Sequence, residues 1–120
     1  MSAWIDFFNE DGRAYWSKLY HPKRFVGTNH LYDFWIDMNE PSVFDGEQST
    51  MPYQNVHQDR VDFDADDYVS IRHRDIHNAY GLLQSSASYE ALIKRNKLFE
   101  VDDSMGRRPF LLTRSFFIGA

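Results

Sequence analysis

The residues of this sequence that could do chemistry gather between Trp35 and Glu40. The run Trp-Ile-Asp-Met-Asn-Glu places two carboxylates, those of Asp37 and Glu40, just behind an aromatic side chain. This combination suits glycoside hydrolysis, in which a ring packs against the sugar and a carboxylate attacks or stabilises an oxocarbenium-like centre. An N-capping Asp and a solvated Glu at the end of a strand would require the same residue types, so composition alone leaves both interpretations open.

A strand is expected to position this pair. Leu31–Met38 is a short aromatic and β-branched run that ends at polar residues and a proline, which is typical of a strand buried on both faces. Asp37 then falls at the C-terminal end of the strand, where the catalytic side chains of a parallel sheet face a common pocket. Before the strand, apolar residues at helical spacing predict a short helix over Arg13–Tyr20.

The remaining elements complete an alternation of helix and strand. Asp45–Asp67 is polar and aperiodic, which predicts a long functional loop. A helix is predicted from an N-cap at Asp75 to about Asn96, followed by a second strand over Pro109–Ile118. This order favours an α/β fold with a parallel sheet, either doubly wound or a (β/α)₈ barrel. Because two strands cannot bury both faces of such a sheet, we interpret the chain as an internal slice of a larger barrel.

Composition narrows the class of protein. Apolar residues make up 42% of the 120 residues and aromatic residues 17%, as in packed globular proteins rather than disordered ones. The net charge of -5 argues against nucleic acid as a partner, since a nucleic-acid surface needs clustered Lys and Arg. The absence of cysteine excludes disulfides, thiol catalysis and cysteine-based zinc sites from this segment. No apolar run reaches the roughly 18 to 20 residues of a membrane span.

Four motifs resemble those of one enzyme family. Trp35–Phe44 matches W-x-D-M-N-E-P-S-x-F, the signature of glycoside hydrolase family 31, without a break. Trp4–Phe7, His73–Gly81 and Arg114–Gly119 resemble further segments of that family, so similarity spans nearly the whole chain. The resemblance implies a (β/α)₈ barrel, of which residues 1–120 would form part of the catalytic domain: about the fourth strand, its helix and the fifth strand.

The resemblance also implies roles for individual residues. Asp37 matches the catalytic nucleophile, and Glu40 matches a supporting carboxylate beside it. Trp35 and Met38 match residues that line the subsite of the cleaved glucose, and Arg114 matches an arginine that contacts this sugar. Two neighbouring carboxylates repel each other, so Arg114 is expected to compensate and to keep Asp37 ionised. The mechanism needs no metal and no organic cofactor.

The implied activity is hydrolysis of terminal α-linked glucose with retention of configuration, through a glucosyl ester on Asp37. In the family the acid/base is an aspartate in a W-T-G-D segment, which would lie beyond Ala120, so this segment alone is expected to be inactive. The His73–Gly81 and Arg114–Phe117 runs most resemble members that trim N-linked glycans in the endoplasmic reticulum lumen with a regulatory β subunit. Lysosomal or digestive α-glucosidases and α-xylosidases remain alternatives, as does a non-catalytic or degenerate carbohydrate-binding segment.

Two patterns suggest metals but fit them poorly. Asp62–Asp66 opens like a calcium loop, yet Asp67 replaces the required Gly, which favours a solvated acidic loop. His57, His73 and His77 lack the helical i, i+4 pair with a nearby Glu that zinc metalloproteases use. His77 is therefore predicted to be a core or capping histidine.

Overall fold

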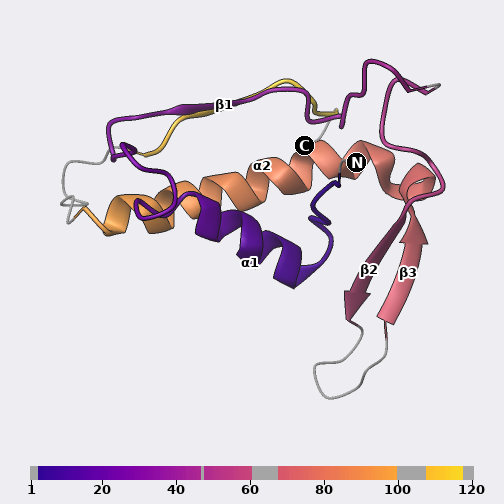
Figure 1. Ribbon diagram of the computed structural model, residues 1–120, viewed down its shortest axis with the longest axis horizontal. Coiled ribbons are helices and arrows are strands. Elements are labelled where there is room, and N and C mark those ends of the chain that lie inside the picture. The colour runs from indigo at the N-terminus through magenta and orange to yellow at the C-terminus, as the bar shows by residue number, and fades with distance from the viewer. Residues whose placement is uncertain (1–2, 47, 61–67, 100–107, 118–120) are drawn as a thin grey trace.

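The fold combines helices with two small sheets. The computed structural model describes residues 3–46, 48–60, 68–99 and 108–117. The elements in chain order are α1 (Glu10–Leu19), β1 (Phe34–Ile36), β2 (Val56–Arg60), β3 (Tyr68–Arg72), α2 (His73–Lys97) and β4 (Leu111–Thr113). The strands β1 and β4 run side by side along α2, α1 lies along another side of α2, and β2 and β3 project from its N-terminal end (Figure 1). The predicted α/β class is confirmed.

The sheet of β1 and β4 is parallel, as predicted. Its register pairs Phe34 with Leu111 and Trp35 with Leu112. Both strands are shorter than the predicted runs, although Ile118 lies outside the described residues. The prediction that the first strand is buried on both faces is wrong here, because Ile36 is 6% exposed and Trp35 is 63% exposed. Among the described elements, the helices cover one face of this sheet only.

The core lies between the two helices and the covered face of the sheet. One cluster consists of Phe7, Met51, Tyr80 and Ala87, and a second consists of Tyr20, Ala91 and Leu92, with Phe34 and Leu111 packed against it. The α2 helix contributes to both clusters and is therefore the central support of the fold. Fully burying each large apolar side chain contributes roughly 1.5 to 3 kcal/mol, so contacts along α2 hold the strands in place.

Both helices begin earlier than predicted. The carboxamide oxygen of Asn9 accepts hydrogen bonds from the backbone N–H groups of Asp11 and Gly12, so α1 starts at Glu10 rather than Arg13. In α2 the N-cap is Arg72, whose side chain makes no capping bond, and the predicted cap at Asp75 is wrong. Asp75 lies instead in the first turn, where its negative charge complements the helix dipole.

Part of the predicted loop is a strand. β2 pairs antiparallel with β3, from Val56 opposite Arg72 to Arg60 opposite Tyr68. Its sequence, Val-His-Gln-Asp-Arg, lacks the apolar alternation that would reveal a strand, so the prediction of a loop over all of Asp45–Asp67 is wrong. The calcium-like run Asp62–Asp66 lies outside the described residues.

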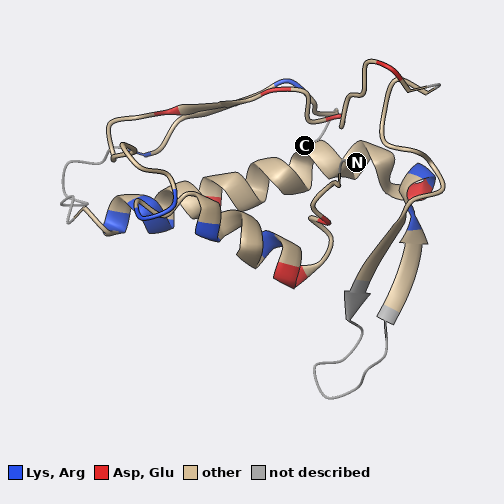
Figure 2. Ribbon diagram, in the orientation of Figure 1, with Lys and Arg blue, Asp and Glu red and all other residues tan. Residues whose placement is uncertain are grey.

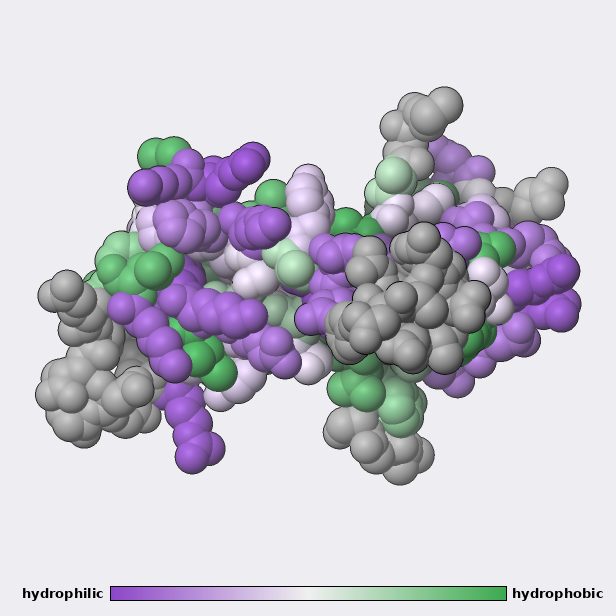
Figure 3. Space-filling view, turned by 90° about the horizontal axis from the view of Figure 1, so that it is seen from below, coloured by the Kyte–Doolittle hydropathy of each residue, from purple (hydrophilic) through white to green (hydrophobic). Residues whose placement is uncertain are grey.

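Apolar and hydrophilic residues alternate on the side of the molecule away from β1 and β4. Seen from below, green apolar patches there are broken up by purple hydrophilic ones (Figure 3). Among the described residues, no helix is both long and apolar enough to cross a membrane.

Candidate active site

Asp37 lies on the uncovered face of the parallel sheet, directly after β1. Phe34 packs against the helical core, and side chains alternate along a strand, which places Trp35 and Asp37 on the opposite face. The Asp37 Oδ1 atom accepts a hydrogen bond from the backbone N–H of Met38 at 2.9 Å. Met38 itself has a φ of 60°, an uncommon left-handed conformation for a long side chain, so the chain turns sharply behind the carboxylate.

Arg114 joins the predicted carboxylates. Its Nε donates to Glu40 Oε1 at 2.8 Å and its Nη2 donates to Glu40 Oε2 at 3.1 Å, while its Nη1 lies 3.3 Å from Asp37 Oδ1. The Nη2 group also lies 3.2 Å from the sulfur of Met38. The structure therefore brings together four of the five predicted site residues, and Arg114 is the centre of the group.

The charges of this group support each other. The hydrogen bond from Arg114 outweighs the opposing effect of partial burial and lowers the pKa of Glu40. In turn the hydrogen bond to Glu40, helped by the charges of Asp37 and Glu40, raises the pKa of Arg114. Their side chains are between 32% and 47% exposed, so water screens the attraction and adds little stability. The arrangement matters for the geometry of the site, because Arg114 places one cation beside the carboxylates of both Asp37 and Glu40.

Aromatic side chains lie beside Asp37. A pocket of about 230 Å³ has Asp37 and Met38 in its wall, with Trp4, Trp16 and Tyr80 around them. Trp4 was recognised in the sequence as part of a motif but not as a site residue. Trp35, Glu40 and Arg114 do not line this pocket. Trp35 shares the open face of the sheet with Asp37 instead, opposite Leu112.

Asn39 is a residue of the site that sequence reasoning missed. It is 2% exposed, and its Nδ2 donates to Thr113 Oγ1 at 2.7 Å while its Oδ1 accepts from the backbone N–H of Ser115 at 3.1 Å. Gly81 of α2 packs against the same place, since a Cβ there would lie 2.7 Å from Ser115 Oγ. A buried asparagine in a loop leaves no periodic signal, and only its position inside the Trp35–Phe44 motif indicated a special role.

A second polar group lies at the N-terminal end of α2. His57 Nδ1 lies 2.8 Å from Asp6 Oδ1, His57 Nε2 lies 3.0 Å from His73 Nδ1, and His73 Nε2 lies 2.8 Å from His77 Nδ1. His73 and His77 thus do form an i, i+4 pair, which the prediction of a later helix start had obscured. Among the described residues, no group of His, Cys, Asp or Glu is arranged to hold a metal.

The pKa values of this group suit hydrogen bonds that link its residues. Burial opposes ionisation of Asp6, but hydrogen bonds from His57 and from the backbone N–H of Gln58 outweigh this effect and lower the pKa of Asp6. Burial, with the charges of His77 and His57, lowers the pKa of His73 to about 4, so His73 is neutral at pH 7. A neutral His73 can pass hydrogen bonds between its neighbours and link β2 to α2.

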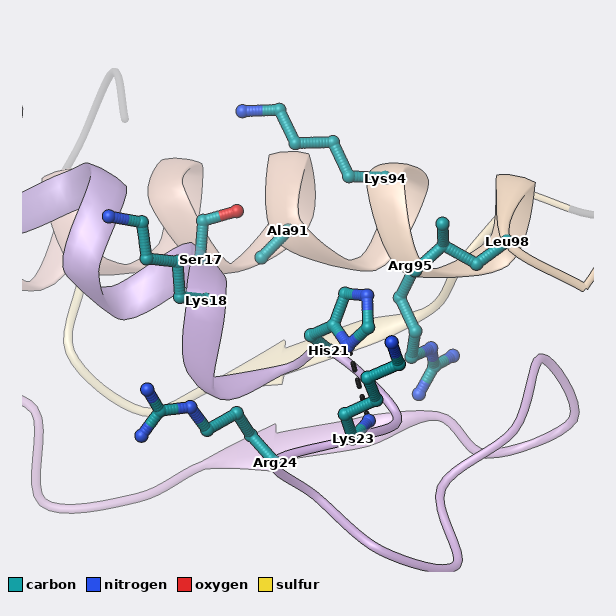
Figure 4. A pocket seen from close by; sticks show the side chains of 9 residues that line it. All are labelled: Ser17, Lys18, His21, Lys23, Arg24, Ala91, Lys94, Arg95 and Leu98. Carbon is teal, nitrogen blue, oxygen red and sulfur yellow. Dashed lines mark hydrogen bonds between the residues drawn. The ribbon is translucent and has the colours of Figure 1, made fainter.

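A larger pocket of about 480 Å³ lies elsewhere, where the C-terminal part of α2 faces the segment after α1. It is lined by Lys18, Lys23, Arg24, Lys94 and Arg95 among others, and none of the described residues that line it carries a carboxylate. Lys and Arg gather at this end of the molecule (Figure 2), and Figure 4 shows Lys18 on α1, Arg24 on the segment after α1 and Lys94 on α2 around this pocket. The described lining therefore lacks the pair of carboxylates that glycoside hydrolysis uses.

The known proteins that this chain resembles agree with the family that its motifs indicate. The chain is 42% identical to glucosidase 2 subunit alpha of Schizosaccharomyces pombe over 98% of its length, and 38% identical to human neutral alpha-glucosidase C over its full length. A crystal structure of a glucosidase II alpha subunit with Glc1Man2 bound superimposes with a TM-score of 0.71 and 39% identity over 97% of the chain.

A second solved structure, of the glucosidase II catalytic subunit with the binding domain of its regulatory subunit, matches 97% of the chain with a TM-score of 0.68 and 39% identity. The chain spans 11% of the length of each of these relatives. The model of the glycosyl hydrolases family 31 TIM-barrel domain matches residues 1–120. With a match of that extent, and with its Asp37–Arg114–Glu40 group at the ends of two parallel strands, the chain belongs to glycoside hydrolase family 31.

Proposed function

We propose that this chain carries the nucleophile of a retaining α-glucosidase. The single observation behind this proposal is the contact of Arg114 with both Asp37 and Glu40 where β1 and β4 end. Asp37 attacks C1 of a terminal α-linked glucose, the bond to the leaving oxygen breaks, and a glucosyl ester forms. Water then hydrolyses the ester and restores Asp37, with retained configuration.

The other residues of the group have supporting roles in this proposal. Arg114 contacts the sugar and lies beside the Asp37 carboxylate, while Glu40 holds the guanidinium by two hydrogen bonds. Trp35 and Met38 line the subsite of the cleaved glucose. The leaving oxygen needs a proton, which an aspartate beyond Ala120 supplies as general acid and later withdraws from water as general base.

The proposal places the chain within a complete barrel. β1 and β4 are neighbouring parallel strands joined through α2, as in a βαβ unit, and we assign them to about the fourth and fifth strands. The apolar side chains of Trp35 and Leu112 on their uncovered face then point into the barrel interior, which further strands complete.

The names of the relatives support a proposal for the substrate class. The matched solved structures are of glucosidase II, one with Glc1Man2 bound and one in complex with a regulatory subunit's binding domain. We therefore propose glucosylated N-glycans as substrate, a regulatory β subunit as partner and the endoplasmic reticulum lumen as compartment. No metal or organic cofactor enters this mechanism.

Covalent labelling of the complete enzyme tests the role of Asp37. A mechanism-based fluoroglucoside should label the peptide that contains Trp35–Glu40, and fragmentation should map the label to Asp37. Asp37→Asn preserves shape but loses the nucleophile, so kcat should fall by several orders of magnitude, whereas Glu40→Gln should cost less.

Three outcomes would count against this proposal. Label on Glu40 would give the nucleophile's role to the other carboxylate. A folded Asp37→Asn enzyme with more than about a tenth of wild-type kcat would remove covalent catalysis at Asp37. A folded wild-type enzyme that binds glucosides but neither reacts with the inhibitor nor hydrolyses them would support the alternative of a carbohydrate-binding protein.

A further inference from the structure

The strongest unexplained feature near the site is the burial of Asn39 among exposed neighbours. Asp37 before it is exposed, Met38 and Glu40 are half-buried, and all three of these contact Arg114, whereas Asn39 contacts the backbone and hydroxyl of the opposite strand end. A carboxamide held at 2% exposure must satisfy its polar atoms inside the protein. Its two hydrogen bonds, one to Thr113 at the end of β4 and one to Ser115 after it, do so.

These two bonds bracket Arg114. Nδ2 of Asn39 reaches Thr113, the residue before Arg114, and Oδ1 of Asn39 holds the backbone N–H of Ser115, the residue after it. One side chain therefore links the loop that carries Asp37 to both neighbours of the arginine. The exposed ion pair between Arg114 and Asp37 is too strongly screened to hold the loops at a fixed separation by itself.

The backbone beside Asn39 also needs support. Met38 is held in the left-handed region at a φ of 60°, a conformation that persists in a long side chain only when its surroundings enforce it. Asn39 follows it directly and is anchored on one side by Thr113 and Ser115. On another side Gly81 leaves room for the Asn39 carbonyl, because a Cβ at Gly81 would lie 3.0 Å from that oxygen.

From this geometry we infer that Asn39 is a positioning residue, which sets the distance between Asp37 and Arg114 by binding the two chain segments that flank the arginine. This inference rests on the proposed function of Asp37. At 2% exposure Asn39 is buried beneath its neighbours, and it acts through the two segments that it binds. Misplacement of a nucleophile by about 1 Å can cost roughly a hundredfold in rate, so loss of this link should reduce kcat more than substrate binding.

The test uses paired variants in the complete enzyme. Asn39→Ala should lower kcat by about ten- to a hundredfold, with KM changed by less than about threefold. Thr113→Val, which keeps the shape but removes the acceptor of the Asn39 bond, should lower kcat in the same direction. Thr113→Ser retains the hydroxyl and should stay close to wild type. If both act through one bond, the Asn39→Ala, Thr113→Val double variant should be no slower than Asn39→Ala alone.

Thr28→Val is the matched control for a purely structural effect. Thr28 is also buried, at 7% exposure, and its Oγ1 accepts a hydrogen bond from Arg95 Nη1 at 3.1 Å. Arg95 lines the pocket of about 480 Å³, and neither residue lines the pocket of Asp37. Loss of this bond should shorten the enzyme's half-life on heating and leave kcat unchanged. The rate of covalent labelling at Asp37 should fall in Asn39→Ala and Thr113→Val but not in Thr28→Val.

The result that overturns the inference is distinct from failure of the proposed function. If wild type is labelled at Asp37 and hydrolyses glucosides, but Thr113→Val and Thr113→Ser have equal kcat, Asn39 does not position the site. Should Asn39→Ala fail to fold, this Thr113 pair decides alone. If wild type is neither labelled nor active, the proposed function fails first, and the inference fails with it.

Discussion

Replacement of Gly81 by alanine would have two opposing effects on stability, a gain in helix propensity and a loss from steric overlap. Gly81 is buried in α2, and at an internal helical position alanine is more stable than glycine by about 1 kcal/mol. The added Cβ would lie 2.7 Å from Ser115 Oγ, 2.9 Å from Ser115 Cβ and 3.0 Å from the Asn39 carbonyl oxygen. Cβ atoms essentially never approach other atoms as closely as the two Ser115 contacts, and the contact with the Asn39 carbonyl is tighter than most, so either α2 or the two loops must move. Overpacking of this kind typically costs roughly 1 to 3 kcal/mol.

Overpacking should win, because part of the obstruction is backbone. The Ser115 hydroxyl can rotate away, but its Cβ and the Asn39 carbonyl move only with the loops that carry Arg114 and Asp37. We expect Gly81→Ala to destabilise the complete enzyme by about 1 kcal/mol net and to lower kcat. The assay is the half-life of activity at a fixed temperature near the inactivation midpoint, with kcat measured before heating.

Ser86→Ala separates helix propensity from steric contact. Ser86 is exposed in the same helix, so the change adds propensity, roughly 0.5 kcal/mol, without a clash. It should lengthen the half-life slightly and leave kcat unchanged. If Gly81→Ala is as stable as wild type or more stable, with full kcat, then α2 does not press on the two loops as we describe.

Two further predictions follow from the charges. Arg114→Ala in the complete enzyme should lower kcat/KM by at least about tenfold, the order of a lost charge-assisted contact, with folding intact; near-normal kinetics in a folded variant would remove Arg114 from the site. Folding lowers the pKa of His73 from 6.5 to about 4, so protonation of His73 favours the unfolded chain. The stability that neutral His73 contributes to the folded state is therefore complete above pH 6.5 and is lost as the pH falls through 4. The loss should reach at most about 2 kcal/mol at pH 5, seen as a lower urea midpoint, and a His73→Asn variant should show a flatter dependence between pH 6.5 and 4; equal slopes would contradict a neutral, buried His73.

Much of the fold could be predicted because its signals are local. The aromatic and β-branched run around Trp35 and the second run around Leu112 identified both parallel strands, and helical periodicity identified α1 and α2. Local signals did not predict β2 or the start of α2 correctly, because contacts with distant residues stabilise β2 and no side-chain cap marks the start of α2. β2 carries a polar sequence and is stabilised by pairing with β3 and by the Asp6 carboxylate, which accepts from the Gln58 amide. The start of α2 was misplaced because its N-cap makes no side-chain bond.

By itself, then, the sequence determined the order of α1, β1, α2 and β4, the family motifs and the position of Asp37 at a strand end. Only the tertiary structure decided which residues meet there. Arg114 is 74 residues from Glu40 in the chain and contacts it because β1 and β4 pair in one register above α2. The links from Asn39 to Thr113 and Ser115, and from Asp6 through His57 to His73, arise in the same way. Such contacts depend on strand register and helix packing, which join distant segments and leave no trace in the spacing of residues along the chain.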